Sequence, residues 1–105
     1  MRLKYIIFDH YGLEYPVIFP ELIEHDRMAQ KVKECDTPSK PISAGFIKIK
    51  QDLEYSGLSY IECYGNSTSL NLESKKEIDS EFIKNFLKGE WDVWKTKRKV
   101  NEICL

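Results

Sequence analysis

Hydrophobic residues at the start of the chain form two short runs separated by polar residues and a glycine. Residues 3–8 and 15–19 are rich in β-branched and aromatic residues, which favour strands. Residues 9–12 lie between them and end in Gly12, which can adopt the positive φ that a tight turn requires. The pattern predicts a β-hairpin. Pro16 has no N–H to donate, so its strand is expected at a sheet edge, or Pro16 at a strand start.

A short helix and a loop are expected after the hairpin. Asp26 can cap the helix N-terminus, and the apolar residues that follow it recur at helical spacing. These residues are Met28, Ala29 and Val32. Residues 33–41 contain two prolines and predict a loop.

Three more strands are predicted in the middle of the chain, over residues 42–50, 58–64 and 67–72. In the first of them, isoleucines alternate with lysines, which is typical of a strand with one buried face. In the last of them, Leu70 and Leu72 are expected to face the core while the polar residues between them face solvent.

A second helix is predicted from the sequence that follows Ser74. Ser74 and Glu77 have the spacing of a capping box, and Gly89 can end the helix. The expected apolar stripe consists of Ile78, Phe82, Ile83, Phe86 and Leu87. The element order is therefore ββαβββα. It predicts an α+β fold with a five-stranded, mainly antiparallel sheet and both helices on one face. Residues 1–89 are expected to form a single domain, followed by a C-terminal extension over residues 90–105.

Composition narrows the class of protein. The chain has 105 residues and a net charge of −1, which fits one domain and disfavours a strongly basic nucleic-acid binder. No segment approaches the length of a membrane span, so no membrane contact is expected. The three cysteines are an odd number without a C-x-x-C pair, which favours a reducing compartment. We therefore expect a cytoplasmic protein.

The C-terminal extension differs in composition from the rest of the chain. Both tryptophans lie within four residues of each other, and residues 95–105 carry a net charge of +3 against −4 for the rest. Such a segment can pack on the domain, bind a partner or a second copy, or contact nucleic acid. A partner-binding role would use Trp91, Trp94, Lys95, Lys97, Arg98 and Lys99.

A glycine turn followed by hydroxyl residues predicts a ligand-binding site. Tyr64 and Gly65 precede three hydroxyl residues, a grouping of donors that suits a phosphate or a nucleotide, although the turn is not a P-loop. The small residues 43–45 could leave room for a close approach, and a tyrosine could stack on a base. The expected ligand-binding residues are His25, Tyr64, Gly65, Ser67 and Ser69. A plain hairpin turn with a polar edge strand explains the same residues.

Residues that suit catalysis are few. His10, His25 and Asp26 could serve a small hydrolase or a nucleotide-processing enzyme. Adjacent residues on a helix do not face each other, however, and a capping aspartate beside a surface histidine explains the same pair. No catalytic residue, metal site or cofactor is assigned from the sequence.

Several short motifs resemble small uncharacterised proteins carried by bacteriophages and prophages, over residues 1–87. The residues that carry this resemblance are Tyr5-Ile6-Ile7-Phe8-Asp9, Pro16-Val17-Ile18-Phe19-Pro20, His25, Ser43-Ala44-Gly45-Phe46, and Tyr64-Gly65 with Ser67 and Ser69-Leu70. The resemblance implies a non-enzymatic accessory protein that binds and inhibits a host protein, such as an anti-phage defence protein, or sequesters a nucleotide signal. A small enzyme and a structural subunit that forms a homo-oligomer are the alternatives.

Overall fold

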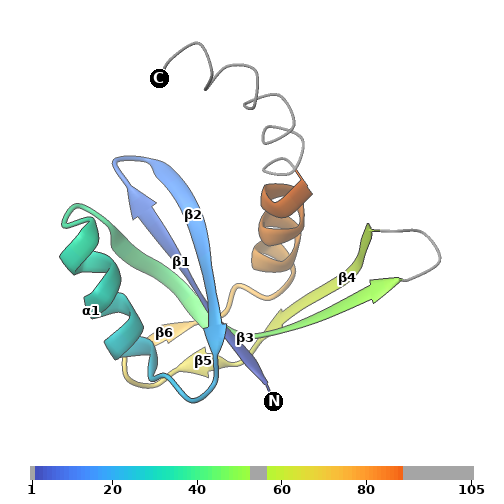
Figure 1. Ribbon diagram of the computed structural model, residues 1–105, viewed down its shortest axis with the longest axis horizontal. Coiled ribbons are helices and arrows are strands. Elements are labelled where there is room, and N and C mark those ends of the chain that lie inside the picture. Colours follow the sequence, from blue (N-terminus) through green and yellow to red (C-terminus); the bar gives the residue numbers. More distant parts are fainter. Residues whose placement is uncertain (1, 53–56, 89–105) are drawn as a thin grey trace, which may run out of the picture.

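A four-stranded antiparallel sheet forms the centre of the molecule (Figure 1). The computed structural model describes residues 2–52 and 57–88. Its elements are β1 (Leu3–His10), β2 (Leu13–Pro20), α1 (His25–Cys35), β3 (Lys40–Asp52), β4 (Gly57–Tyr64), β5 (Asn66–Ser67), β6 (Leu72–Glu73) and a second helix over residues 77–88. The strand order in the main sheet is β2-β1-β3-β4, and β5 and β6 form a small sheet of their own. The α+β class predicted from the sequence is confirmed.

The first two strands form the predicted hairpin. β1 pairs with β2 from Leu3 opposite Pro20 to His10 opposite Leu13. Tyr11 and Gly12 connect them with φ values of 52° and 89°. Two consecutive positive φ angles are typical of a two-residue turn that follows the twist of the strands. β2 is an edge strand, as its proline predicted.

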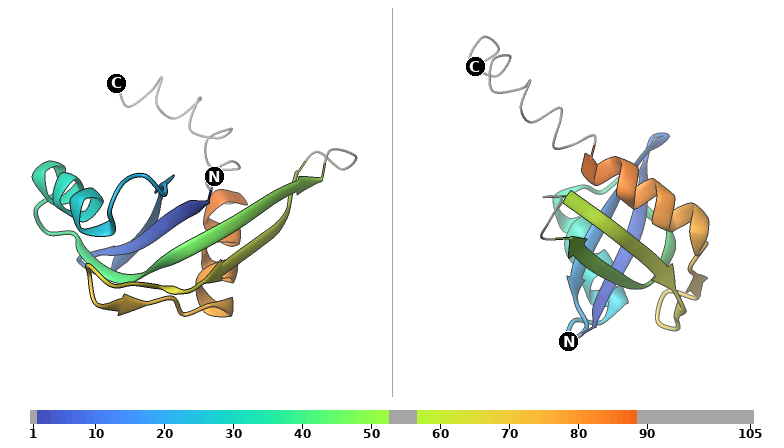
Figure 2. Two further views of the ribbon diagram at one scale, coloured as in Figure 1. Left: turned by 90° about the horizontal axis from the view of Figure 1, so that it is seen from below. Right: turned by 90° about the vertical axis from the view of Figure 1, so that its right-hand side faces the viewer.

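β1 is buried on both faces, and each face is covered by a different helix. Tyr5 and Ile7 pack in a cluster with Ile83 of the second helix. Ile6 and Phe8 point the other way and pack in a cluster with Ala29 of α1. The two helices therefore lie over opposite faces of the sheet (Figure 2). The expectation that both helices share one face is wrong, because a central strand that is apolar on both sides needs a cover on each.

The long strand β3 has two different neighbours. Its first half pairs with β1 as far as Ile47, and its second half pairs with β4 from Phe46 onward. β3 and β4 therefore continue beyond β1 as a two-stranded ribbon that extends away from the rest of the molecule (Figure 1). The predicted loop over residues 33–41 is shorter than expected, because α1 continues to Cys35 and β3 begins at Lys40.

The strand predicted over residues 67–72 does not join the main sheet. Only its ends are extended, in the two-residue strands β5 and β6, and residues 68–71 form a turn. The N–H of Leu70 donates to Ser67 Oγ at 3.2 Å, and Asn71 has a φ of 53°, which no strand accommodates. The five-stranded sheet order is thus not observed. Leu70 and Leu72 nevertheless pack against the core, on the face that α1 covers.

The second helix begins differently from the capping box that the sequence predicted. Ser74 Oγ accepts from the N–H of Lys76 at 3.0 Å, and Asp79 Oδ2 accepts from the N–H of Lys75 at 2.9 Å. Asp79 is 2% exposed, whereas Ile78 is 70% exposed. Ile78 was expected in the apolar stripe. Ile78 faces solvent because the hydrogen bonds of its neighbour Asp79 hold residue 79 toward the core. Neither helix of the described residues is long and apolar enough to cross a membrane.

Candidate functional site

Phe46 lies among the residues that were predicted from the sequence to bind a ligand. It stands on β3 opposite Tyr64 of β4, and the two rings stack with centroids 5.7 Å apart at an angle of 25°. The ring of His25 meets Phe46 edge-on at 6.1 Å. The guanidinium carbon of Arg2 lies 4.4 Å from the centroid of the Phe46 ring. Phe46 therefore joins the start of the chain, α1 and β4.

Cations and aromatic rings alternate along the same face of the ribbon. Lys48 Nζ lies 5.4 Å from the Tyr64 ring centroid, and Lys50 Nζ lies 5.9 Å from that of Tyr60. A cation this close to a ring face is attracted by the ring quadrupole. We call this surface the ribbon face, and it consists of Arg2, Phe46, Lys48, Lys50, Tyr60, Glu62 and Tyr64.

Within the part of the chain that the structure describes, the elements that cover this side of the sheet stop short of the ribbon face. α1, Leu70 and Leu72 cover this side of the sheet over Ile6, Phe8 and Ala44. Beyond Phe46 the side chains of Lys48 and Lys50 are exposed, and Tyr60 is 44% exposed. The opposite side of the ribbon is closed, because its isoleucines pack in the cluster that includes the second helix. The ribbon thus has one core side and one side available to a ligand.

Glu62 is the one carboxylate on the ribbon face. It pairs in register with Lys48, and the Tyr60 hydroxyl donates a short hydrogen bond to its Oε2. This hydrogen bond raises the pKa of Tyr60, because it favours the protonated phenol beside a negative charge. The ring of Tyr60 is therefore a neutral platform held by its neighbour on β4.

Arg2 is fixed over Phe46 by an acidic residue. Its Nε lies 3.0 Å from Glu21 Oε2, and its backbone N–H donates to Glu21 Oε1 at 3.2 Å. These bonds lower the pKa of Glu21, the backbone N–H contributing most. Glu21, which directly follows β2, thereby orients Arg2 so that its guanidinium lies over the Phe46 ring. Lys4, which pairs in register with Phe46, is instead buried and donates from Nζ to the Ile23 carbonyl at 3.0 Å.

His25 lies beneath the Phe46 ring rather than on the open surface. It is 4% exposed, and its ring also meets Phe19 edge-on at 5.4 Å. Its Nε2 lies 3.0 Å from the Gly45 carbonyl oxygen, which can only accept, so Nε2 carries the hydrogen. Burial lowers the pKa of His25, and the nearby Lys4 lowers it further. The imidazole is therefore a neutral support for Phe46.

The hydroxyl groups of the polar turn hold backbone groups of this chain. Ser67 is buried and accepts from the N–H of Leu70, as described above. Ser69 Oγ accepts from the N–H of Asp26 at 3.2 Å and so caps α1 from outside the helix. The expectation that Asp26 caps α1 is wrong, because Glu24 is the N-cap residue and Asp26 lies in the first turn. The turn positions α1 beside the site.

Two glycines let the backbone approach the site closely. A Cβ on Gly45 would lie 2.5 Å from the carbonyl oxygen of Tyr64. Gly65 has a φ of 79°, and a Cβ there would lie 3.0 Å from Cδ2 of Phe46. The space that the small residues 43–45 leave is therefore filled by the backbone of the same chain.

The three residues considered for catalysis are not brought together. His25 packs between Phe19 and Phe46, which both pair with Lys4 near the start of β1. His10 is the last residue of β1, roughly 20 Å along the strand at about 3.3 Å per residue. The set of His10, His25 and Asp26 therefore does not form one site.

His10 instead belongs to a separate hydrogen-bonded cluster. Its Nδ1 lies 2.8 Å from Asp36 Oδ2, which also accepts from the Ser39 hydroxyl at 2.5 Å. The Ser39 hydroxyl lies 2.7 Å from that of Tyr15. The hydrogen bond from Ser39, followed by that from His10, lowers the pKa of Asp36. This cluster ties the end of the first hairpin to the segment between α1 and β3.

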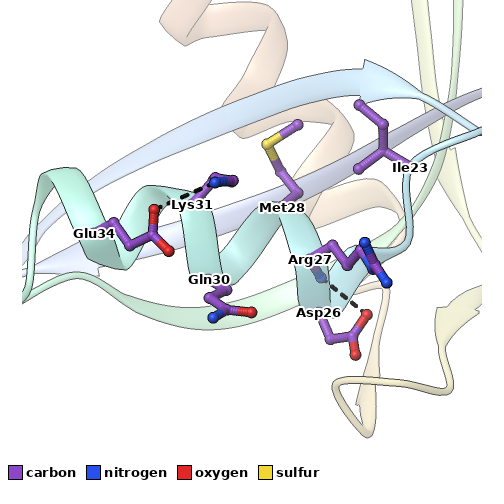
Figure 3. Close-up of a pocket in the computed structure, with 7 residues that line it drawn as sticks. All are labelled: Ile23, Asp26, Arg27, Met28, Gln30, Lys31 and Glu34. Carbon is purple, nitrogen blue, oxygen red and sulfur yellow. Dashed lines mark hydrogen bonds and ion pairs between the residues drawn. The ribbon is translucent and has the colours of Figure 1, made fainter.

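An open hollow of about 610 Å³ runs along the outer side of α1 (Figure 3). Its lining residues are Ile23, Asp26, Arg27, Met28, Gln30, Lys31 and Glu34. Two acidic and two basic side chains balance each other, and Lys31 pairs with Glu34 at 3.5 Å. The hollow therefore offers no concentration of charge. Within residues 2–52 and 57–88, no group of three histidine, cysteine, aspartate or glutamate side chains is arranged to hold a metal ion.

The partner-binding residues predicted in the C-terminal extension lie outside the described residues. They are Trp91, Trp94, Lys95, Lys97, Arg98 and Lys99. Of the predicted ligand-binding residues, the structure gathers His25, Tyr64 and Gly65 around Phe46, with Ser69 at the adjoining end of α1. Sequence reasoning missed Arg2, Lys48 and Lys50 as members of this surface. The alternation of residues 46–50 was the available signal.

Comparisons with protein-family models, with curated proteins and with solved structures find no match to this chain. The function is therefore inferred from the geometry of the chain itself.

Proposed function

We propose that this protein is a non-enzymatic binding protein that holds a nucleotide-type ligand on the stacked rings of Phe46 and Tyr64. The observation that carries the proposal is the position of this ring pair between two cations on an open sheet face. Because Phe46 and Tyr64 stack on each other and carry Arg2 and Lys48 over their rings, a base would stack there by displacing one of these cations. Stacking of a base on an aromatic ring contributes about 1–3 kcal/mol in nucleic-acid complexes. Arg2 and Lys48 lie on either side, where a phosphate can be neutralised.

The surroundings of the platform favour binding without turnover. The histidine nearest to the rings is buried and neutral, and its Nε2 hydrogen is donated to a backbone carbonyl. The nearby hydroxyls accept from backbone N–H groups. In the setting of a bacteriophage or prophage protein in the host cytoplasm, such a surface would sequester a nucleotide signal.

The experiment is a calorimetric titration with adenosine monophosphate, adenosine and inorganic phosphate. We expect the monophosphate to bind more tightly than either part alone, because it uses both rings and cations. Tyr64→Leu and Lys48→Gln should each weaken binding about tenfold. Lys31→Gln, which removes an exposed lysine from α1, should leave it unchanged. Binding that is equal in all four proteins, or absent at millimolar nucleotide, would reject the proposal.

A host protein as the partner is the second candidate, and the tip of the first hairpin favours it. Tyr11 and Leu13 are 82% and 72% exposed on a turn whose tyrosine has a positive φ. Large apolar side chains that are exposed on a tight turn are typical anchors of a protein interface. The test is capture of a host protein by the wild-type chain and its loss in a Tyr11→Asn, Leu13→Ser double variant. Retention of the same partner by that variant would exclude the tip.

A further inference from the structure

We infer that the ligand of the ribbon face is single-stranded nucleic acid, bound along β3 and β4 from the Phe46–Tyr64 rings to Tyr60. The inference rests on the proposed function, because the platform at Tyr64 is the first of two stacking positions on the same surface. It names the class of ligand, a chain of nucleotides instead of a single one.

The second stacking position is Tyr60. It lies four residues before Tyr64 on the same strand and on the same face, or roughly 13 Å away at about 3.3 Å per residue. Tyr60 is 44% exposed and has its own cation in Lys50, as the first position has Lys48. A mononucleotide has one base and can occupy only one position. A chain of nucleotides can occupy both.

The spacing of charge on the ribbon face suits a phosphate backbone. Lys48 lies between the two stacking positions in the register of β3 and β4, Lys50 lies at the far one, and Arg2 lies at the near one. Glu62 is an opposing charge on this face, and Glu21 pairs with Arg2 at its near end. The whole chain has a net charge of −1, so the attraction to phosphates is local to this face.

Stacking on exposed rings distinguishes single strands from duplexes. Bases in a duplex are already stacked on each other and paired, so their faces are not available to a protein side chain. In sheet-based RNA-binding modules, two or three unpaired bases stack on aromatic residues of the open sheet face. The open side of β3 and β4 offers the same two elements, rings on one face and cations between them.

The experiment measures fluorescence anisotropy of labelled oligothymidylate and oligouridylate of about 12 nucleotides, a labelled duplex, and competing thymidine monophosphate. We expect both single strands to bind more tightly than the monophosphate and more tightly than the duplex. The logarithm of the binding constant should fall with the logarithm of salt concentration with a slope of about −2, for three cations on a single strand. If one of the two single strands binds more tightly than the other, the difference shows whether DNA or RNA is preferred.

The variants separate the two stacking positions. Tyr60→Ala should weaken oligonucleotide binding roughly 5- to 150-fold and bring it toward the affinity of the monophosphate. Glu62→Gln should strengthen it, because a carboxylate that repels phosphates is removed. Lys31→Gln, which removes an exposed lysine of α1 away from the ribbon face, should change nothing. Circular dichroism confirms the fold of each variant.

The outcomes distinguish this inference from the proposed function. Tighter binding of the single strands, lost in Tyr60→Ala, supports both. Equal affinity for monophosphate and oligonucleotide, with no effect of Tyr60→Ala, overturns the inference and leaves the proposed function in place. Tighter binding to the duplex overturns the inference as well. Binding of neither monophosphate nor oligonucleotide overturns both.

Discussion

The Tyr5 hydroxyl donates a 2.5 Å hydrogen bond to Asp79 Oδ2, across 74 residues of sequence. The same oxygen accepts from the Ser43 hydroxyl and from the backbone N–H of Lys75. Tyr5, Ser43 and Asp79 are all buried. Burial, and then the hydrogen bond to Asp79, raise the pKa of Tyr5, so the phenol remains protonated and able to donate. One carboxylate thus fixes the second helix to the centre of the sheet.

Removal of this carboxylate should be among the most destabilising single changes in the described residues. Asp79→Ala removes the acceptor of two buried hydroxyl groups and of the part-buried N–H of Lys75, and we expect a loss of about 3 kcal/mol or more in the free energy of unfolding. Tyr5→Phe removes one donor and keeps the rest, and should cost about 1–3 kcal/mol. Urea denaturation measures both. Ile78→Ala on the same helix is the control, and it should change stability by about 0.5 kcal/mol or less.

Two glycine substitutions compare the cost of a steric clash at Gly45 with the cost of a strained backbone conformation at Gly12. Gly45→Ala places a methyl group 2.5 Å from the Tyr64 carbonyl oxygen on the neighbouring strand, where the backbone cannot yield, and should cost about 2–3 kcal/mol. Gly12→Ala has no atom within 4 Å of the new methyl group and a φ of 89°. It should cost about 1 kcal/mol through conformation alone. Thermal melts of the two variants that reverse this order would contradict the packing at Gly45.

Stability should decrease as the solution is acidified through the titration of His25. Its pKa is lower in the folded state than in the unfolded state, mainly because of burial. The unfolded chain therefore binds the proton first. The stabilisation is complete above the unfolded pKa, near 6.5, and is lost as the pH falls from there through the folded value. Urea melts from pH 8 to pH 5 should show a smaller decrease for His25→Gln, whose amide can still donate to Gly45. Equal slopes for the two proteins would place the titration elsewhere.

The two described cysteines should differ in reactivity toward thiol reagents. Burial raises the pKa of Cys63 to about 11, and its side chain is covered in the core. Cys35 is exposed at the end of α1. In a Cys104→Ser variant, which removes the third thiol, one thiol should react rapidly and the second only after unfolding. Rapid labelling of both thiols in the native protein would show that β4 opens. A further Cys35→Ser substitution should abolish the rapid reaction, which identifies Cys35 as the thiol that reacts rapidly.

Much of the fold follows from local sequence patterns. The predictions that are wrong concern positions that are fixed by contacts between residues far apart in the sequence. The first hairpin, α1 and the strands β3 and β4 were predicted because their periodicity and turns are local features. The second helix was predicted with Ile78 inward. Periodicity could not show that Asp79 would be buried instead, because its donors Tyr5 and Ser43 lie 74 and 36 residues away.

The candidate site shows the same division between local and distant information. Alternation in residues 46–50 and 60–64 indicates a strand with polar residues on one side. Only the register, with Phe46 opposite Tyr64 and Lys50 opposite Tyr60, shows that rings and lysines meet. The contact of Arg2 with Phe46 depends on a salt bridge to Glu21, which no local pattern contains.

The placement of the two helices on opposite faces has a consequence during synthesis. The chain emerges from its N-terminus at about 5–20 residues per second. The side of β1 that carries Ile6 and Phe8 meets part of its cover in α1 early, whereas the Tyr5 side lacks Asp79 and Ile83 until the second helix has been made. A nascent chain therefore presents the Tyr5 side of its central strand to the cell after α1 has covered part of the other side. Chaperones that recognise exposed apolar strands would bind there until the second helix has been made and covers this side.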